Sequence, residues 1–307
     1  MLITFACPKC RSELEIEASA AGTSLDCPQC HTQLTVPRKE FGPGVTIGGF
    51  KIEKLLGEGG MGQVFLARQL SMDRHVALKI LPPQFTTSKG SVERFLNEVH
   101  MAARLEHSNV VPAYEAGEDN GIYYLAMAYV KGEPLADQLA QNGAMPERDA
   151  LRMVRKIAGA LKFAWDEHRI LHRDIKPSNI MVDQHGEPKL LDMGLSKSLD
   201  DTAGLTLSGT VMGTPNYMSP EQAQGKAEID FRTDMYSLGA TLYHMLTGTM
   251  PFASSSLMET LRKQVTESLP DPRELNPKIS GFRFSAQIPI FLMSHAWHFP
   301  HAMESLL

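Results

Sequence analysis

The sequence predicts an α+β fold with a sheet-rich first lobe and a helical second lobe, preceded by a small cysteine-rich module. Strand-like alternation of apolar and polar residues dominates from Ile47 to about residue 130, and helical periodicity dominates after it. All 4 cysteines lie within the first 30 residues. With 43% hydrophobic and 21% charged residues, the 307-residue chain has the composition of a globular protein with a sizeable core.

Net charge and hydropathy exclude several classes of protein. The formal charge of -5 gives no broad basic surface, so nucleic acid is not an expected partner. The first residues have neither the basic start nor the apolar core of a signal peptide, and no run of about 18 apolar residues is present that would span a bilayer. We therefore expect a soluble, cytoplasmic chain without a membrane segment.

The cysteines form two Cys-x-x-Cys pairs, Cys7 with Cys10 and Cys27 with Cys30, separated by 16 residues. This spacing is typical of a structural zinc site in which two turns each supply two thiolates to one tetrahedral ion. The alternatives are reduced free thiols or two disulfides, and a cytosolic redox state disfavours the latter. His31 is an alternative ligand, although four sulfurs already complete the shell.

The predicted zinc ribbon covers residues 1–36, with short strands at 13–17 and 33–36. A module of this size buries too little surface to fold alone, so the metal must supply the missing stability. Its charged residues balance to a negative value, which favours a structural role or contact with a protein over contact with nucleic acid. Residues 37–46, with their prolines and glycines, form the expected linker. We expect no internal repeat.

After the linker, strand patterns occupy residues 51–59, 62–70 and 74–81, which predicts a small antiparallel sheet. Residues 91–105 place apolar side chains at helical spacing, and a further strand pattern covers residues 123–130. A single helix beside a sheet is therefore expected in this lobe.

The second lobe begins with a strong helical pattern at 146–168, with Pro146 at a favourable position in the first turn. A second apolar helix is predicted at 235–248, ended by Gly248.

A glycine-rich stretch lies between two of the predicted strands, with Gly57, Gly59 and Gly62 in the spacing GxGxxG. Glycines allow a hairpin backbone to close over phosphate oxygens and to donate its amides to them. By itself the motif fits a flexible turn equally well. Lys79 follows on a later strand, and Glu98 lies on the predicted helix. As single residues, both fit ordinary surface charges.

Residues 172–179 read HRDIKPSN, and Asp192 follows in LLDMGLSK. Together with the glycine stretch and the VALK sequence around Lys79, these residues resemble serine/threonine protein kinases, and most closely the bacterial kinases of the eukaryotic-like type. The resemblance implies a two-lobed protein-kinase fold, with an antiparallel N-lobe and a helical C-lobe, that binds ATP and Mg²⁺. It implies transfer of the γ-phosphate to serine or threonine hydroxyls of protein substrates.

The resemblance also assigns roles. Asp174 would accept the proton of the attacking hydroxyl, Lys176 would meet the γ-phosphate, and Asn179 and Asp192 would hold Mg²⁺. Lys79 would hold the α- and β-phosphates and pair with Glu98. Met127 would be the gatekeeper and Ala128 to Val130 the hinge. The residues expected to contact ATP are Leu56, Gly57, Gly59, Gly62, Val64, Ala77, Lys79, Met127, Tyr129, Val130 and Met181.

The segment from Asp192 to Glu221 is similar to an activation segment. Phosphate on Thr206, Ser208 or Thr210 would pair with Arg173 and order this segment, by autophosphorylation among other routes. Asp234 would brace the catalytic loop from the start of a helix.

The sequence departs from the family pattern in three places. Met193 replaces the usual phenylalanine, and methionine fills similar apolar space. No arginine is found to pair with Glu221, which would leave that carboxylate without its buried partner. Beyond Ile279 the resemblance is expected to stop, so the predicted kinase domain covers residues 47–276 with an incomplete C-lobe, and residues 277–307 form a divergent tail.

This tail leaves two further functions open. One is a catalytically impaired pseudokinase or scaffold that binds nucleotide and partners, and the other is an adaptor that acts only through the zinc ribbon. Histidines at 295, 298 and 301 lack regular helical spacing, so a metal site in the tail is not expected.

Overall fold

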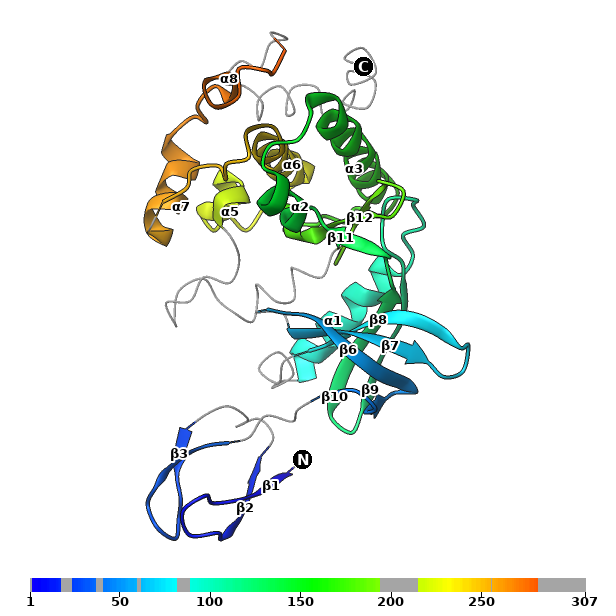
Figure 1. Ribbon diagram of the computed structural model, residues 1–307, viewed down its shortest axis with the longest axis vertical. Helices are drawn as coiled ribbons and strands as arrows, with labels where there is room; N and C mark the ends of the chain where they lie inside the picture. The colour runs from blue at the N-terminus through cyan, green and yellow to red at the C-terminus, as the bar shows by residue number, and fades with distance from the viewer. Residues whose placement is uncertain are drawn as a thin grey trace. The chain divides into compact units, whose positions relative to one another are not determined.

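The computed structural model describes residues 2–17, 24–36, 41–59, 62–81, 89–193, 215–254 and 256–280. The chain divides into two compact units, the first comprising residues 1–96 and 113–129 and the second residues 97–112 and 130–307. The first unit contains the cysteine module and an antiparallel sheet, and the second contains most of the helices, which run from green to orange in Figure 1. The expected division into a sheet lobe and a helical lobe is therefore confirmed.

The cysteine module consists of two β-hairpins with the same design. In the first, β1 (Leu2–Ala6) pairs with β2 (Glu13–Glu17), and in the second, β3 (Ser24–Asp26) pairs with β4 (Gln33–Thr35). Leu14 and Leu34, which lie at equivalent positions of the two hairpins, are buried against Cys7 and Cys27. The two strand patterns read from the sequence thus correspond to β2 and β4.

The N-lobe contains a six-stranded antiparallel sheet in the order β5-β6-β7-β8-β10-β9. Its strands are β5 (Thr46–Ile47), β6 (Phe50–Gly59), β7 (Gly62–Gln69), β8 (Arg74–Ile80), β9 (Ala113–Asp119) and β10 (Ile122–Ala128). Alternate residues of these strands, including Phe50, Phe65 and Val76, form one apolar cluster. This alternation is the reason that the sheet was predictable, with the exception of β5 and β9.

The chain enters the N-lobe across this cluster. Phe41 and Val45 are partly buried against it, and the Phe41 and Phe65 rings meet edge to face with centroids 6.3 Å apart. Tyr124, 4% exposed, fills the space beside Gly48, where a Cβ atom would lie 2.2 Å from the tyrosine oxygen. The Tyr124 hydroxyl donates to Glu115 at 2.9 Å, so the hydroxyl end of this ring is fixed.

The helix α1 (Lys89–Ala102) lies between β8 and β9 in sequence, and its residues are divided between the two units. It corresponds to the helix predicted at 91–105, and Val99 on its predicted apolar face is buried.

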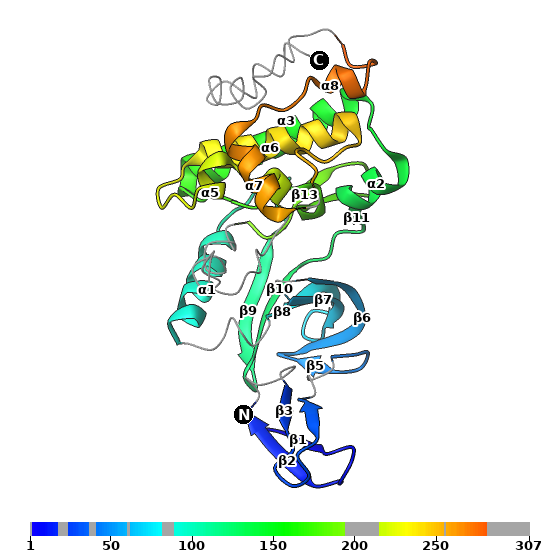
Figure 2. The same cartoon turned by 90° about the vertical axis from the view of Figure 1, so that its left-hand side faces the viewer.

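The C-lobe is built around two long helices, α3 (Glu147–His168) and α6 (Phe231–Thr247), which run side by side (Figure 2). Their apolar faces, with Val154 and Ile157 on α3 and Leu238 and Leu242 on α6, form the centre of the C-lobe core. The shorter elements are β11 (Gly132–Pro134), α2 (Leu135–Asn142), β12 (Ile180–Asp183), β13 (Pro188–Leu190), α5 (Pro220–Ala223), α7 (Leu257–Thr266) and α8 (Pro272–Leu275).

Both long helices were predicted, and their starts differ slightly from the expected ones. Pro146 precedes α3 at the N-cap rather than lying in its first turn. The helix α6 begins at Phe231, four residues before the predicted start, because the Asp230 side chain accepts from the Arg232 amide and caps it. Gly248 ends α6 in the left-handed conformation, as predicted.

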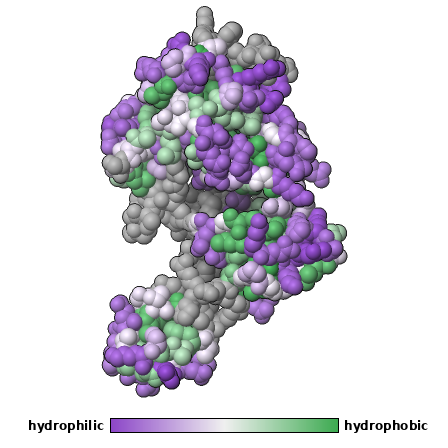
Figure 3. Space-filling model, viewed as in Figure 1, coloured by the Kyte–Doolittle hydropathy of each residue, from purple (hydrophilic) through white to green (hydrophobic). Residues whose placement is uncertain are grey.

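The described C-lobe ends in a fixed segment. Ile279 is 5% exposed within the C-lobe core, and the next residue, Ser280, donates through its amide and its hydroxyl to the Glu147 carboxylate at 2.9 and 2.8 Å. Within the described ranges, every helix is too short or too polar to cross a bilayer. Hydrophilic residues, purple in Figure 3, dominate the visible described surface.

Candidate active site and cysteine cluster

The glycine stretch forms the end of the hairpin between β6 and β7. Gly57 lies opposite Val64, and Gly59 lies opposite Gly62, whose φ of 113° lies in a region that favours glycine. The tip of the hairpin, residues 60 and 61, lies outside the described residues. The strands on either side confirm that these glycines belong to a hairpin between strands, not to a strand-to-helix turn.

Lys79 lies on β8, directly opposite Val64 on β7 and Leu125 on β10. It is 5% exposed, and buried lysine is rare because an ammonium loses its hydration there. This burial argues against an ordinary surface charge. The Glu98 backbone lies in α1, but its side chain is outside the described part of the chain, so its pairing with Lys79 stays a prediction.

Two of the residues expected to contact adenine lie together in the sheet. Ala77 on β8 is directly opposite Met127 on β10, and both are buried. Leu56 is 40% exposed on β6, and Tyr129 is half-buried just after β10. In the C-lobe, Val130 and Met181 are also half-buried, and Met181 lies on β12. Their contacts with ATP stay predictions.

The catalytic loop holds its polar side chains close together. Lys176 Nζ lies 2.8 Å from Asp174 Oδ2, and Asn179 Nδ2 donates to the same oxygen at 2.8 Å. Asn179 Nδ2 also donates to the Asp174 carbonyl at 2.7 Å. The Asp174 carboxylate is therefore fixed by one ammonium and one amide, and both of these groups bind the same oxygen.

Asp234 braces this loop, as the sequence predicted. Its Oδ2 accepts from the His172 amide and its Oδ1 from the Arg173 amide, each at 2.7 Å. Burial raises the pKa of Asp234, whereas the nearby His172 and these amide bonds oppose the rise. The His172 ring, fully buried, donates from Nε2 to the Leu191 carbonyl at 2.7 Å and accepts the Asp174 amide at Nδ1.

The residue before Asp192 is hydrogen-bonded to the catalytic loop. Leu191 donates its amide to the Asn179 carbonyl at 2.9 Å, and its carbonyl accepts from His172. The backbone of Asp192 has a φ of 52°, an unusual value for a residue with a Cβ atom. Met193 is buried in the C-lobe core, in agreement with its expected packing role.

Most of the expected activation segment, including Thr206, Ser208 and Thr210, lies outside the described residues. Its end is well anchored. Gln264 on α7 donates to the Pro215 carbonyl at 2.9 Å, and the Tyr217 hydroxyl lies 2.7 Å from His244 Nδ1 on α6. Arg173, the expected phosphate partner, lies in the left-handed region with a φ of 68°.

Glu221 has a hydroxyl partner among the described residues, whereas its pairing with an arginine is not tested by them. Thr233 Oγ1 donates to Glu221 Oε1 at 2.7 Å, and the half-buried carboxylate is thereby bound to the first turn of α6. A hydroxyl is therefore the partner of this carboxylate within the part of the chain that the structure describes. Sequence inspection missed it because only charged partners were sought.

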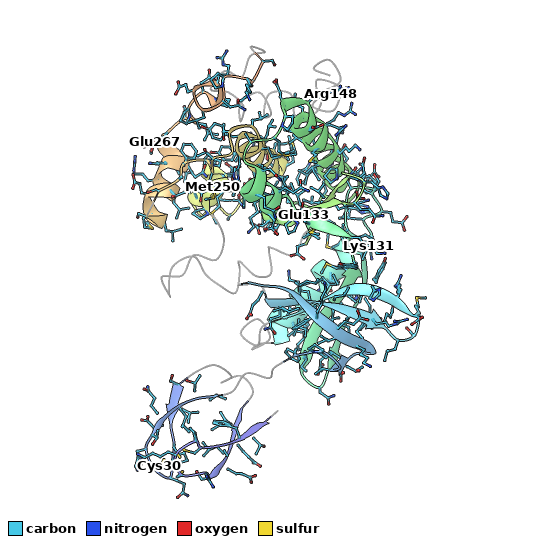
Figure 4. The ribbon with its side chains drawn as sticks, in the orientation of Figure 1. Cys30, Lys131, Glu133, Arg148, Met250 and Glu267 are labelled. Atoms are coloured by element: carbon cyan, nitrogen blue, oxygen red, sulfur yellow. The ribbon has the colours of Figure 1, made fainter. Side chains whose placement is uncertain are left out.

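The four cysteines form a compact cluster. Their sulfur atoms all lie within 4.8 Å of one another, with Cys7 to Cys30 and Cys10 to Cys27 each 3.7 Å apart. A tetrahedral zinc ion with Zn–S bonds of about 2.3 Å requires sulfur separations of about 3.8 Å. The donor set and its spacing therefore fit zinc. Cys30 is labelled in Figure 4.

The two cysteine turns repeat each other, so the expectation of no internal repeat is wrong. In the first turn the Cys7 amide donates to Ser12 and the Arg11 amide to Cys7, and Cys27, Thr32 and His31 make the same two bonds in the second. Arg11 and His31 both have left-handed φ values, 62° and 54°. Besides the cysteines, Pro8 and Leu14 recur as Pro28 and Leu34, so a signal of the repeat was present in the sequence.

Sequence inspection also missed the two hydroxyl residues of the turns. Ser12 Oγ lies 3.1 Å from Cys10 Sγ, and Thr32 Oγ1 lies 3.4 Å from Cys30 Sγ. Burial opposes ionisation of Cys27, but bonds from the Cys30 and Gln29 amides and from Ser12 outweigh it and lower its pKa to about 6. A thiol of this kind ionises readily, as a metal ligand must. The signal was a hydroxyl residue two positions after each second cysteine.

The sheet lobe with its buried lysine and the helical lobe with its braced aspartate define the class of this chain. It belongs to the protein kinase domain family, whose model matches residues 50–287. The match continues past Ile279, where the resemblance was expected to stop.

Within this family the similar proteins are bacterial serine/threonine protein kinases. The kinase Pkn3 of Myxococcus xanthus is 41% identical over 238 residues, which cover 74% of this chain and 43% of that protein. The kinase PrkC of Bacillus subtilis is 36% identical over 232 residues, covering 76% of this chain and 35% of that protein. The chain thus spans less than half of the length of these relatives.

Solved structures of the same class share the fold. The PknI kinase domain of Mycobacterium tuberculosis superimposes with a TM-score of 0.68 at 25% identity, covering 87% of this chain and 100% of that domain. Another structure of that domain gives a TM-score of 0.67 at 26% identity, with 87% and 98% coverage. The predicted kinase fold is confirmed.

Proposed function

We propose that this chain is a serine/threonine protein kinase that transfers the γ-phosphate of ATP to hydroxyls of protein substrates. The observation that supports this most directly is the Asp174 carboxylate, which Lys176 and Asn179 hold through one of its oxygens. A carboxylate that is fixed in this way can orient a hydroxyl and accept its proton. The brace from Asp234 keeps the loop in this arrangement.

Each residue of the catalytic loop has a distinct part in this proposal. Asp174 Oδ2 is engaged by two donors, so its second oxygen is the proposed acceptor for the substrate proton. Lys176, whose side chain is 13% exposed, places a positive charge beside that carboxylate, where negative charge develops on the transferred group.

The residues of the C-lobe fit a bound magnesium ion. Asn179 uses its amide nitrogen on Asp174, which leaves its Oδ1 as the candidate ligand. The Leu191 amide bond to Asn179 holds Asp192 next in sequence to that site. Amide and carboxylate oxygens are the ligands that Mg²⁺ prefers, and bound Mg²⁺ neutralises charge on the phosphates. In the N-lobe, Lys79 is the proposed partner of the α- and β-phosphates, with Glu98 as its counter-charge.

We also propose that the four cysteines bind a structural zinc ion. The sulfur separations of 3.7 Å and the lowered pKa of Cys27 support this. The ribbon carries more acidic than basic side chains. We therefore propose that a partner of the ribbon would be a protein.

The kinase proposal is tested with the purified chain, γ-labelled ATP, Mg²⁺ and dephosphorylated casein. Asp174→Asn should lower kcat by about 100-fold or more, because it removes a general base, and Lys79→Met should abolish most transfer. Asp137→Asn is the matched control, since Asp137 is exposed on α2, and it should transfer label like the wild type.

Two outcomes distinguish an active kinase from a catalytically impaired scaffold. If the wild type transfers no more label than Asp174→Asn while it binds ATP, the scaffold function stands and the kinase proposal fails. In an active protein, mass spectrometry of the same incubation should find phosphate on Thr206, Ser208 or Thr210, the hydroxyls proposed to pair with Arg173 once phosphorylated.

A further inference from the structure

We infer that Gln222 is a positioning residue for the catalytic loop. The inference rests on the kinase activity proposed above, because it concerns how Asp174 is held in place for that reaction. Gln222 lies on α5, at the end of the expected activation segment, and it is far from Asp174 in sequence. Its side chain nevertheless contacts the residue immediately before Asp174.

The carboxamide of Gln222 makes two specific hydrogen bonds. Its Nε2 donates to the Arg173 carbonyl at 2.8 Å, and its Oε1 accepts from the Ser219 amide at 3.1 Å. These partners fix the orientation of the carboxamide, because a carbonyl only accepts and a backbone N–H only donates. Ser219 is itself fully buried, and its hydroxyl accepts from the Gln222 amide at 3.3 Å. Gln222 therefore connects a buried helix cap to the catalytic loop.

The bond matters because of the conformation of Arg173. Its φ of 68° is unfavourable for a residue with a Cβ atom, so surrounding contacts must maintain it. The Arg173 amide is held by Asp234, which fixes the peptide before this residue. The Arg173 carbonyl, held by Gln222, belongs to the peptide that leads directly into Asp174. The two side chains thus restrain both peptides around the strained residue, and the Gln222 bond sets the direction in which Asp174 begins.

A purely structural role for Gln222 makes a different prediction. Ser219 and Gln222 form a capping box, a motif in which glutamate serves as well as glutamine at the second position. Gln222→Glu keeps an acceptor for the Ser219 amide, so a residue that only capped α5 would tolerate it. The same variant has no N–H to donate to the Arg173 carbonyl at neutral pH and places a carboxylate against it. Loss of activity in Gln222→Glu therefore distinguishes positioning from capping.

The experiment compares full-length wild type, Gln222→Glu, Gln222→Met and Gln224→Glu in steady-state transfer from ATP to casein. Gln224 is exposed two residues further along the chain, so Gln224→Glu is the matched control. We expect kcat to fall about tenfold in both Gln222 variants, with KM for ATP changed less than about twofold. A Gln222→Glu variant with the same kcat as Gln224→Glu would overturn the inference.

Hydrogen–deuterium exchange tests the contact without any activity. Amides of residues 173–175 should exchange about tenfold faster in Gln222→Glu than in the wild type. In Gln224→Glu their exchange rate should equal that of the wild type. If the wild type transfers no phosphate, the kinase proposal fails, and the exchange still decides whether Gln222 holds the loop. Unchanged exchange in Gln222→Glu would overturn the inference even in an active kinase. The test relies on Gln222→Glu, which keeps the cap of α5. It therefore remains valid even if Gln222→Met fails to fold.

Discussion

Replacing Asp234 with alanine should destabilise the C-lobe by about 2–4 kcal/mol. The change leaves the His172 and Arg173 amides without their acceptor, and each orphaned buried donor costs about 1–3 kcal/mol. Alanine also removes a carboxylate whose pKa is raised by burial, and relief of that desolvation offsets part of the loss. The expected value therefore lies in the lower part of the summed range.

Urea unfolding followed by far-UV circular dichroism measures this loss. Asp230→Ala is the matched control, because it removes a half-buried aspartate from the same helix and should cost about 1 kcal/mol, the usual value of an N-cap. The reasoning is refuted if Asp234→Ala is no more destabilising than Asp230→Ala. Asp234→Ala should also lower kcat, since the loop that carries Asp174 loses its brace.

Two further predictions concern the first unit. Gly48→Ala should lower the free energy of unfolding by about 3 kcal/mol, because its Cβ would meet the buried Tyr124 hydroxyl at 2.2 Å and its φ of +55° is strained. Gly49→Ala is the control. It has a φ of +82° but no atom within 4 Å of its Cβ, so it should cost about 1 kcal/mol. Equal losses in urea unfolding would contradict the clash. Treatment with a strong chelator should release one zinc per chain and speed amide exchange in residues 7–30, but not in residues 47–280. A chain that is purified under reducing conditions, binds no zinc and keeps slow exchange in 7–30 would contradict the zinc site.

The elements with strong periodicity were predictable from the sequence. The strands β6, β7 and β8 contribute alternate residues to one apolar cluster, and α3 carries a continuous apolar face, so local pattern was sufficient. The strand β9 was missed because its sequence, AYEAGED, is polar, and it is defined by pairing with β10. The start of α6 was displaced because a cap, Asp230, determines it rather than the apolar pattern.

The site divides in the same way. Motif spacing placed Asp174, Asn179 and Lys79 on their elements, because these motifs are local in sequence. The contacts of Thr233 with Glu221 and of Gln222 with Arg173 join distant segments, and no periodicity encodes them. The spacing of Ser219 and Gln222 does announce a capping box, but only the fold shows that the free end of the glutamine reaches the catalytic loop.

The duplicated hairpins at the N-terminus have one more consequence. Among the described strands, none of one hairpin pairs with a strand of the other, so the sulfur cluster and the apolar side chains around it join the two hairpins. Each hairpin supplies two of the four sulfurs, so neither hairpin could complete the proposed metal site alone. The order of the hairpins and the length of the connection between them are then nearly irrelevant to the site. If zinc holds the two hairpins together, the concentration of available zinc would determine the fraction of molecules in which this module is assembled.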